Sequence, residues 1–252
     1  MTQHVRVTTA DRVTTIRLDR PDKRNAITLE MYAALSDALT GAAADPAVRA
    51  VVLAGGRDCF TAGNDLGDFV RAAQGGDTAS GARFLRTLAG FDKPLIGAVA
   101  GVAIGIGTTM LLHCDLVYAA PSARFRTPFV DLALVPEAGS SILLPALVGA
   151  RRAAQLLLLG EQLDAQTALA WGLINAVVED PDAAAAAAAG KLAGLPPGAL
   201  RATRVLTRPS REAVLEAMRV EGEAFTERLR STEAMEAFQA FLARRPADFS
   251  RF

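Results

Sequence analysis

The sequence predicts an α/β fold, in which strands and helices alternate around one core before a helical region ends the chain. Short apolar runs with strand character alternate with helical patterns over the first two thirds of the sequence. From about Arg151 onward the pattern is almost wholly helical. Because no linker is long enough to separate independent domains, we expect a core over residues 1–195 and a C-terminal helical region over residues 196–252.

The first elements follow from the spacing of apolar residues. Residues 5–8 and 13–18 have the period-two character of strands, which predicts a hairpin with its turn at Asp11 and Arg12. Residues 50–54 form a short, continuously apolar run that is typical of a strand buried on both faces. Between them, Thr28 is the expected N-cap of a helix that the stretch 41–46 closes. The apolar face of this helix consists of Met31, Leu35, Ala38 and Leu39.

The same alternation recurs farther along the chain. We expect strands at 95–100 and 115–119, with helices beginning at about Gly107 and Ala138. Pro181 and the alanine run that follows predict a surface helix, because proline suits the first helical position and alanine is the best helix former. The last two helices are expected at about 211–230 and 232–244.

Composition excludes several classes of protein. The 252 residues carry 27 basic and 27 acidic side chains, and this balance argues against nucleic acid as the main ligand. Two cysteines and two histidines are too few for a disulfide framework or a metal site, so we expect no metal. The N-terminus lacks an apolar segment of signal-peptide length, which favours a cytoplasmic location.

Residues 94–112 are uncharged and near the length of a membrane span. Their hydrophobicity is diluted by glycine and threonine, and no second span exists to pack against them. We therefore expect a buried strand, a tight turn and a buried helix here, and no association with a membrane.

Two glycine-bearing turns are the most informative feature of the sequence. Residues 60–66 and 101–107 each follow a predicted buried strand. Glycine lets the backbone turn sharply and approach a ligand, which leaves main-chain N–H groups unpaired. Two converging N–H donors would form an oxyanion hole, although two purely structural turns would show the same spacing.

Four motifs occur in order at residues 20–26, 62–65, 101–115 and 160–175. Together they resemble the enoyl-CoA hydratase/isomerase, or crotonase, family. The resemblance covers nearly the whole chain and implies a spiral of ββα units with a C-terminal helical trimerisation region. It also implies an acyl-coenzyme A thioester as ligand, a homotrimer or a dimer of trimers, and no cofactor apart from the coenzyme A of the substrate.

The resemblance also implies which residues act on the thioester. The peptide N–H groups of Ala62 and Ile106 would hold its oxygen. Hydratases of the family carry two glutamates that handle water, and the matching positions here are Thr109 and Phe129. Neither side chain can act as a carboxylate acid or base, so hydration of a 2-enoyl-CoA is not expected as the main activity.

A carboxylate does occur at Glu137. The run 125–141 is similar to the peroxisomal type of Δ3,Δ2-enoyl-CoA isomerase, in which the matching glutamate is the catalytic base. Burial among Phe129, Leu134 and Ile142 would raise the pKa of Glu137, whereas a nearby helix N-terminus would lower it. The alternative is that Glu137 is a carboxylate at the N-terminus of a helix over residues 138–147, where it only favours the helix dipole.

The remaining substrate contacts are also implied by the resemblance. Lys23 and Arg24 match a basic loop near the nucleotide, and Phe241 and Arg244 match positions that reach it, often in a neighbouring subunit. A solvated helix end is the alternative for Arg244. Residues 66–92 are expected to form a mobile segment beside the acyl pocket. The other expected binding residues are Ala62, Gly63, Asn64, Asp65, Leu66, Gly105 and Phe129, with Asp65 chiefly holding its turn.

These residues predict an isomerase that shifts the double bond of a 3-enoyl-CoA to give a 2-enoyl-CoA, with Glu137 as the base. Another reaction of the family on an acyl-CoA remains an alternative: hydrolysis, decarboxylation, dehalogenation or residual hydration. A non-catalytic acyl-CoA binder is a further alternative, suggested by the missing hydratase glutamates. An RNA-binding role is disfavoured by the zero net charge and by the three scattered lysines.

Overall fold

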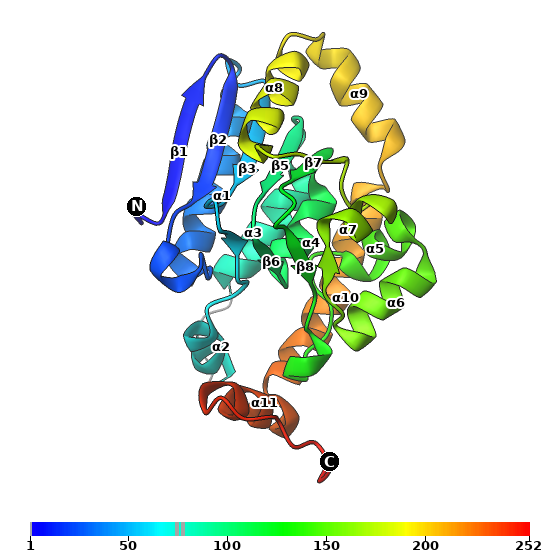
Figure 1. The fold of residues 1–252 in the computed structure, drawn as a ribbon. Coiled ribbons are helices and arrows are strands. Elements are labelled where there is room, and N and C mark those ends of the chain that lie inside the picture. Colours follow the sequence, from blue (N-terminus) through cyan, green and yellow to red (C-terminus); the bar gives the residue numbers. More distant parts are fainter. Residues whose placement is uncertain (1, 74–75, 77–78) are drawn as a thin grey trace.

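A computed structural model describes residues 2–73, 76 and 79–252, and it has the α/β architecture that the sequence predicts (Figure 1). The main sheet has six strands in the order β1-β2-β3-β5-β7-β10, and all neighbours except β1 and β2 run parallel. Its strands are β1 (Val5–Ala10), β2 (Val13–Leu18), β3 (Ala50–Ala54), β5 (Leu95–Val99), β7 (Leu116–Ala119) and β10 (Ala176–Val177).

A second, smaller sheet explains the spiral course of the chain. After β3, β5 and β7 the chain runs directly into β4, β6 and β8, so each turn of the spiral adds one strand to each sheet. The sequence did not indicate these strands, because a run of two or three residues shows no periodicity. The second sheet consists of β4 (Cys59–Thr61), β6 (Val102–Ile104), β8 (Arg124–Arg126) and β9 (Leu163–Asp164).

Gly101 forms the corner between the two sheets. The predicted strand 95–100 ends at Val99, and the chain turns at Gly101, whose φ is +62°. A Cβ atom built there would lie 1.9 Å from the carbonyl oxygen of Asp58. Only glycine fits this position, since the left-handed φ and the close backbone approach both exclude a side chain.

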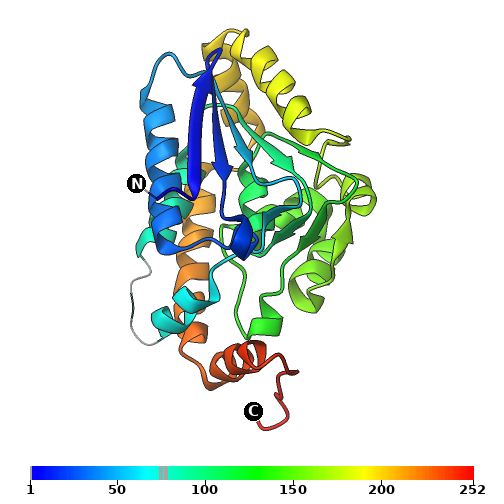
Figure 2. The same cartoon turned by 60° about the vertical axis from the view of Figure 1, so that its left-hand side comes forward.

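Helices cover both faces of the main sheet. Val51 and Leu53 point into the large core shared with α1 (Leu29–Ala44) and α3 (Ala79–Gly90), while Val52 points to the other face. There it packs with Ala185 and Ala189 of α8 (Pro181–Ala193). Figure 2 shows α1 and α8 on opposite sides of the sheet. The alanine run is therefore not simply a surface helix, as the sequence suggested: its small side chains bring α8 close to the strands.

Most predicted element boundaries agree with the structure. Asp11 and Arg12 form the hairpin turn with left-handed φ angles of 49° and 65°. The Thr28 side chain accepts a hydrogen bond from the amide of Met31, as expected of an N-cap. The helix expected from Gly107 is only a short turn, α4 (Ile106–Thr109), followed by the 3-10 helix η2 (Met110–His113).

The expected mobile segment 66–92 is mostly helical where the structure describes it. It contains α2 (Leu66–Ala73) and α3, whereas residues 74, 75, 77 and 78 lie outside the described residues. The uncharged stretch 94–112 forms β5, β6, α4 and the start of η2. Within the described ranges, no helix is both long enough and apolar enough to cross a membrane.

The chain ends in helices, as predicted. α10 packs against α3 and α5, and α11 lies with the C-terminus at the end of the molecule opposite α8 and α9 (Figure 1). The other helices are η1 (Pro21–Lys23), η3 (Val130–Leu132), α5 (Ser140–Val148), α6 (Ala150–Leu159), α7 (Ala165–Ala170), α9 (Pro197–Thr207), α10 (Arg211–Leu229) and α11 (Thr232–Leu242).

Candidate active site

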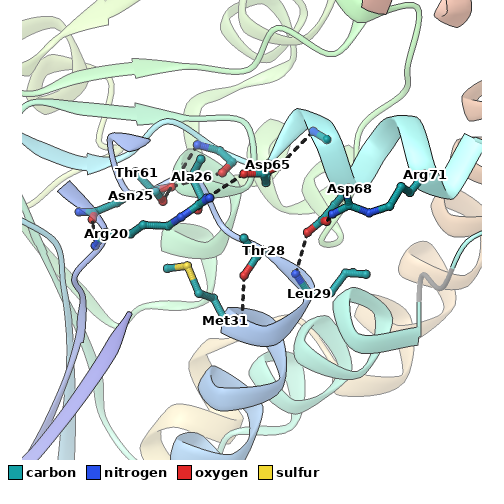
Figure 3. A network of polar contacts seen from close by, with 12 residues as sticks. Arg20, Asn25, Ala26, Thr28, Leu29, Met31, Thr61, Asp65, Asp68 and Arg71 are labelled. Carbon is teal, nitrogen blue, oxygen red and sulfur yellow. Dashed lines mark hydrogen bonds and ion pairs between the residues drawn. The ribbon is translucent and has the colours of Figure 1, made fainter. Parts of the chain in front are cut away.

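A polar network holds the first glycine turn against the loop that precedes α1 (Figure 3). The Arg20 guanidinium binds the Asp65 carboxylate at 2.7 Å and the carbonyl of Ala26 at 2.9 Å. Buried Asn25 donates to the carbonyls of Cys59 and Phe60 at 2.9 and 3.1 Å. Asp65 therefore holds its turn, as expected, and its carboxylate does not line either cavity described below.

The backbone bonding of this turn engages some of its amides and leaves two of them available. The amide of Ala62 donates to the carbonyl of Arg24 at 2.9 Å, so the prediction that it serves as an oxyanion donor is wrong. The amides of Gly63 and Asp65 are also engaged, by the Thr61 hydroxyl and the Ile27 carbonyl. Among the described residues, the amide of Asn64 has no acceptor. The amide of Leu66, at the end of the turn, has no acceptor in the described chain either. The first free donor after Ala62 is thus two residues beyond the predicted one.

The second turn also leaves an amide without an acceptor. Gly105 donates its own amide to the carbonyl of Arg126 at 2.8 Å, and its carbonyl accepts from the amides of Thr108 and Thr109. The amide of Ile106, the first residue of α4, has no acceptor in the described part of the chain. The Ile106 side chain is fully buried, so it anchors α4 in the core.

Glu137 lies in the wall of a cavity and shortly before the first residue of α5. Its carboxylate accepts a hydrogen bond from the Thr109 hydroxyl at 2.8 Å. Burial raises its pKa to about 7, the hydrogen bond from Thr109 opposes this rise, and the charge of Glu221 adds to it. Leu134 is buried as expected, but Ile142 is 38% exposed and does not contribute. A carboxyl group with a pKa near neutrality can both accept and return a proton.

Glu137 lines a cavity of about 190 Å³, which we call the inner cavity. Its wall is mostly apolar and comes from α1, α2, α3 and α10. Tyr32, which the sequence analysis missed, donates its hydroxyl proton to the Asn64 side-chain oxygen at 2.5 Å. Nothing in the sequence marked Tyr32, because it occupies an ordinary position on the buried face of α1. The apolar lining includes Phe69, Leu85, Phe225 and Leu229.

An outer cavity of about 850 Å³ adjoins the inner one, since Asn64, Phe69 and Phe225 line both. Most of the predicted substrate-binding residues lie here: Arg24, Ala62, Gly63, Asn64, Leu66, Gly105, Phe129 and Phe241. Lys23 and Arg244 do not line it; Arg126 and Arg245 do. Residue Arg244 has a left-handed φ of 53°, and the guanidinium of Arg245 is bound to Glu236. The sequence could not distinguish two adjacent arginines at a helix end.

Comparison with known proteins is consistent with this geometry. Residues 8–251 match the family model described as enoyl-CoA hydratase/isomerase. The chain is 37% identical over 250 residues to enoyl-CoA delta isomerase 2 of Rattus norvegicus. The aligned region covers 95% of this chain and 63% of that protein. It is 34% identical to 2,3-dehydroadipyl-CoA hydratase of Escherichia coli, covering 96% of the chain and 97% of that protein.

The solved structure of an enoyl-CoA hydratase/isomerase from Pseudoalteromonas atlantica is similar with a TM-score of 0.93 and 42% identity, over 98% of this chain and 100% of that one. The chain spans slightly less than two thirds of the length of the curated delta isomerase relatives. Isomerases and hydratases are similar to this chain at nearly equal sequence identities. The names of these relatives therefore establish the family but do not single out one reaction. The resemblance of the sequence motifs is confirmed: the chain belongs to the enoyl-CoA hydratase/isomerase family and has the crotonase fold.

Proposed function

We propose that this enzyme shifts the double bond of a 3-enoyl-CoA to give the 2-enoyl-CoA. The observation that carries the proposal is the environment of Glu137. Three carboxylates line the inner cavity in the described chain, but Asp68 is bound to Arg71 and the amide of Leu29, and Glu221 is bound to two amides. Glu137, held only by a threonine hydroxyl, is the carboxylate available to a substrate.

The reaction needs an anion-stabilising site and one proton carrier. The thioester oxygen would accept hydrogen bonds from the free amides of Asn64 and Ile106, each contributing roughly 3 kcal/mol to the stabilisation of an oxyanion. The Glu137 carboxylate takes a proton from C2, and the electrons of that C–H bond spread over the thioester oxygen and carbons 2 to 4. The same carboxyl group returns the proton to C4, which leaves a double bond between C2 and C3.

The positions that carry hydratase glutamates support this choice over hydration. Thr109 uses its hydroxyl to donate to Glu137, and Phe129 lies in the apolar wall of the outer cavity. Neither side chain can activate a water molecule. We therefore assign the acyl chain to the inner cavity and the coenzyme A portion to the outer one, near Arg24, Arg126 and Arg245.

Assays of both substrate classes over a range of pH test the proposal. We expect 3-enoyl-CoAs to give conjugated 2-enoyl-CoAs, seen by their ultraviolet absorbance, faster than 2-enoyl-CoAs give 3-hydroxyacyl-CoAs. Because only the ionised form of Glu137 can accept the C2 proton, kcat should rise with pH and reach half its maximum near pH 7. A 3-hydroxyacyl-CoA as the main product, or a covalent acyl group trapped on Glu137, would assign a different reaction of the family.

The charge of the inner cavity should restrict which acyl chains bind there. Its lining in the described chain holds Asp68, Glu137 and Glu221 and no lysine, arginine or histidine. A substrate with a carboxylate at the far end of its acyl chain would bury an unpaired negative charge beside others. We expect kcat/KM to be at least about tenfold lower for such a substrate than for its methyl ester, a difference of about 1.4 kcal/mol. Equal values for acid and ester would show that the chain end lies outside this cavity.

A further inference from the structure

We propose that Glu221 of α10 is a positioning residue for the base: its carboxylate binds the turn that carries Glu137 and places a second negative charge beside it. The proposal rests on the proposed function for the role of Glu137. Glu221 is far from this turn in the sequence, and no motif marks it. Its position depends on how α10 packs against α5.

Both oxygens of Glu221 are used on the turn. Oε2 accepts from the amide of Gly139 at 2.6 Å, and Oε1 accepts from the amide of Ser141 at 2.8 Å. Glu221 is only 7% exposed and forms no ion pair in the described chain. A buried carboxylate without a cation is costly unless hydrogen bonds satisfy it, so these two amides account for its burial.

The turn itself needs to be held. Ala138 and Gly139 have consecutive left-handed φ angles of 63° and 71°, which is an unusual conformation for alanine. The Nε2–H of His113 donates to the Ala138 carbonyl at 2.8 Å. The turn is therefore bound from η2 on one side and from α10 on the other. Loss of the α10 contact would let the residue next to Glu137 relax toward ordinary backbone angles.

Glu221 also acts on Glu137 through its charge. Both side chains line the inner cavity, and the charge of Glu221 contributes to the raised pKa of Glu137. The other titratable groups that line this space in the described chain are Tyr32 on α1 and Asp68 on α2, and Asp68 is already paired with Arg71. Removing the charge of Glu221 should thus lower the pKa of Glu137, whereas shortening its side chain should mainly loosen the turn.

Two substitutions separate these effects. For Glu221→Gln we expect the midpoint of the kcat profile to move to lower pH and kcat to fall at least about tenfold, because small displacements of a catalytic group are costly. For Glu221→Asp we expect a similar loss of kcat with the midpoint near its parent value. KM should change little in both. Asp164→Ala, which removes the N-cap of α7, is the control: it should reduce stability and leave the pH midpoint unchanged.

Infrared titration of the Glu137 carboxyl group, assigned by its loss in Glu137→Gln, gives a readout that needs no turnover. The proposal predicts a lower midpoint in folded Glu221→Gln than in the parent. An unchanged midpoint and full kcat in Glu221→Gln would overturn it. If the parent isomerises no 3-enoyl-CoA but the infrared midpoint still moves, the proposed function fails and the coupling of Glu221 to Glu137 stands.

Discussion

Glu137→Gln should lose isomerase activity by about 10³-fold while keeping its fold and its affinity for the thioester. General acid–base catalysis by a positioned side chain typically contributes 10²- to 10⁴-fold. Glutamine has nearly the same shape and can still accept the hydrogen bond from Thr109, but it cannot take a proton from C2. The measurement is kcat for a 3-enoyl-CoA together with the dissociation constant of a saturated acyl-CoA. Turnover within tenfold of the parent would place the base elsewhere.

The pH dependence of stability provides a control for the same variant. The pKa of Glu137 is about 7 in the folded protein and ordinarily 4.5, so the folded state holds this proton more tightly. The resulting stabilisation is complete below pH 4.5 and is lost as the pH rises through 7. Glutamine does not titrate. The melting temperature of Glu137→Gln relative to the parent should therefore increase between pH 5 and pH 8, and a constant difference would contradict the raised pKa.

Asn25→Ala should destabilise the protein by about 3 kcal/mol, because three hydrogen bonds of about 1 kcal/mol each are lost. Asn25 is 2% exposed; its side chain accepts from the amide of Arg20 at 2.7 Å and donates to the carbonyls of Cys59 and Phe60. Its φ of 55° suits asparagine better than alanine, which adds to the cost. At this chain length we expect the melting temperature to fall by roughly 6 to 12 °C.

Asn175→Ala is the matched control for this prediction. The Asn175 side chain is exposed and makes one hydrogen bond, accepting from the amide of Val117 at 2.7 Å. Its loss should cost about 1 kcal/mol. If Asn25→Ala melted no lower than Asn175→Ala, the network of Figure 3 would not be what holds the first glycine turn.

The elements predicted correctly are those with a strong local pattern. The strand at residues 50–54 is continuously apolar, and the cap at Thr28 has the expected side-chain acceptor. The strands of the second sheet were missed because they are only two or three residues long. The burial of α8 could not be predicted either, since an alanine run suits a solvated helix and a closely packed one equally well.

The site was predicted in outline and corrected in detail. The glycine spacing pointed to the two turns, and the resemblance pointed to Glu137 and to most of the predicted residues that line the outer cavity. It misplaced the first oxyanion donor, because whether an amide is free depends on acceptors distant in sequence, here the carbonyls of Arg24 and Ile27. Tyr32 and Glu221 were missed for the same reason: each reaches the site only after the helices pack.

Transfer of label between two carbons tests the role of Glu137 most directly. A 3-enoyl-CoA deuterated at C2 is mixed with excess enzyme for a single turnover in ordinary water, and the product is examined by NMR. Since one carboxyl group removes the C2 hydrogen and returns it, the 2-enoyl-CoA should carry deuterium at C4. A product whose new C4 hydrogen comes entirely from solvent, or one that carries a hydroxyl group at C3, would contradict this mechanism.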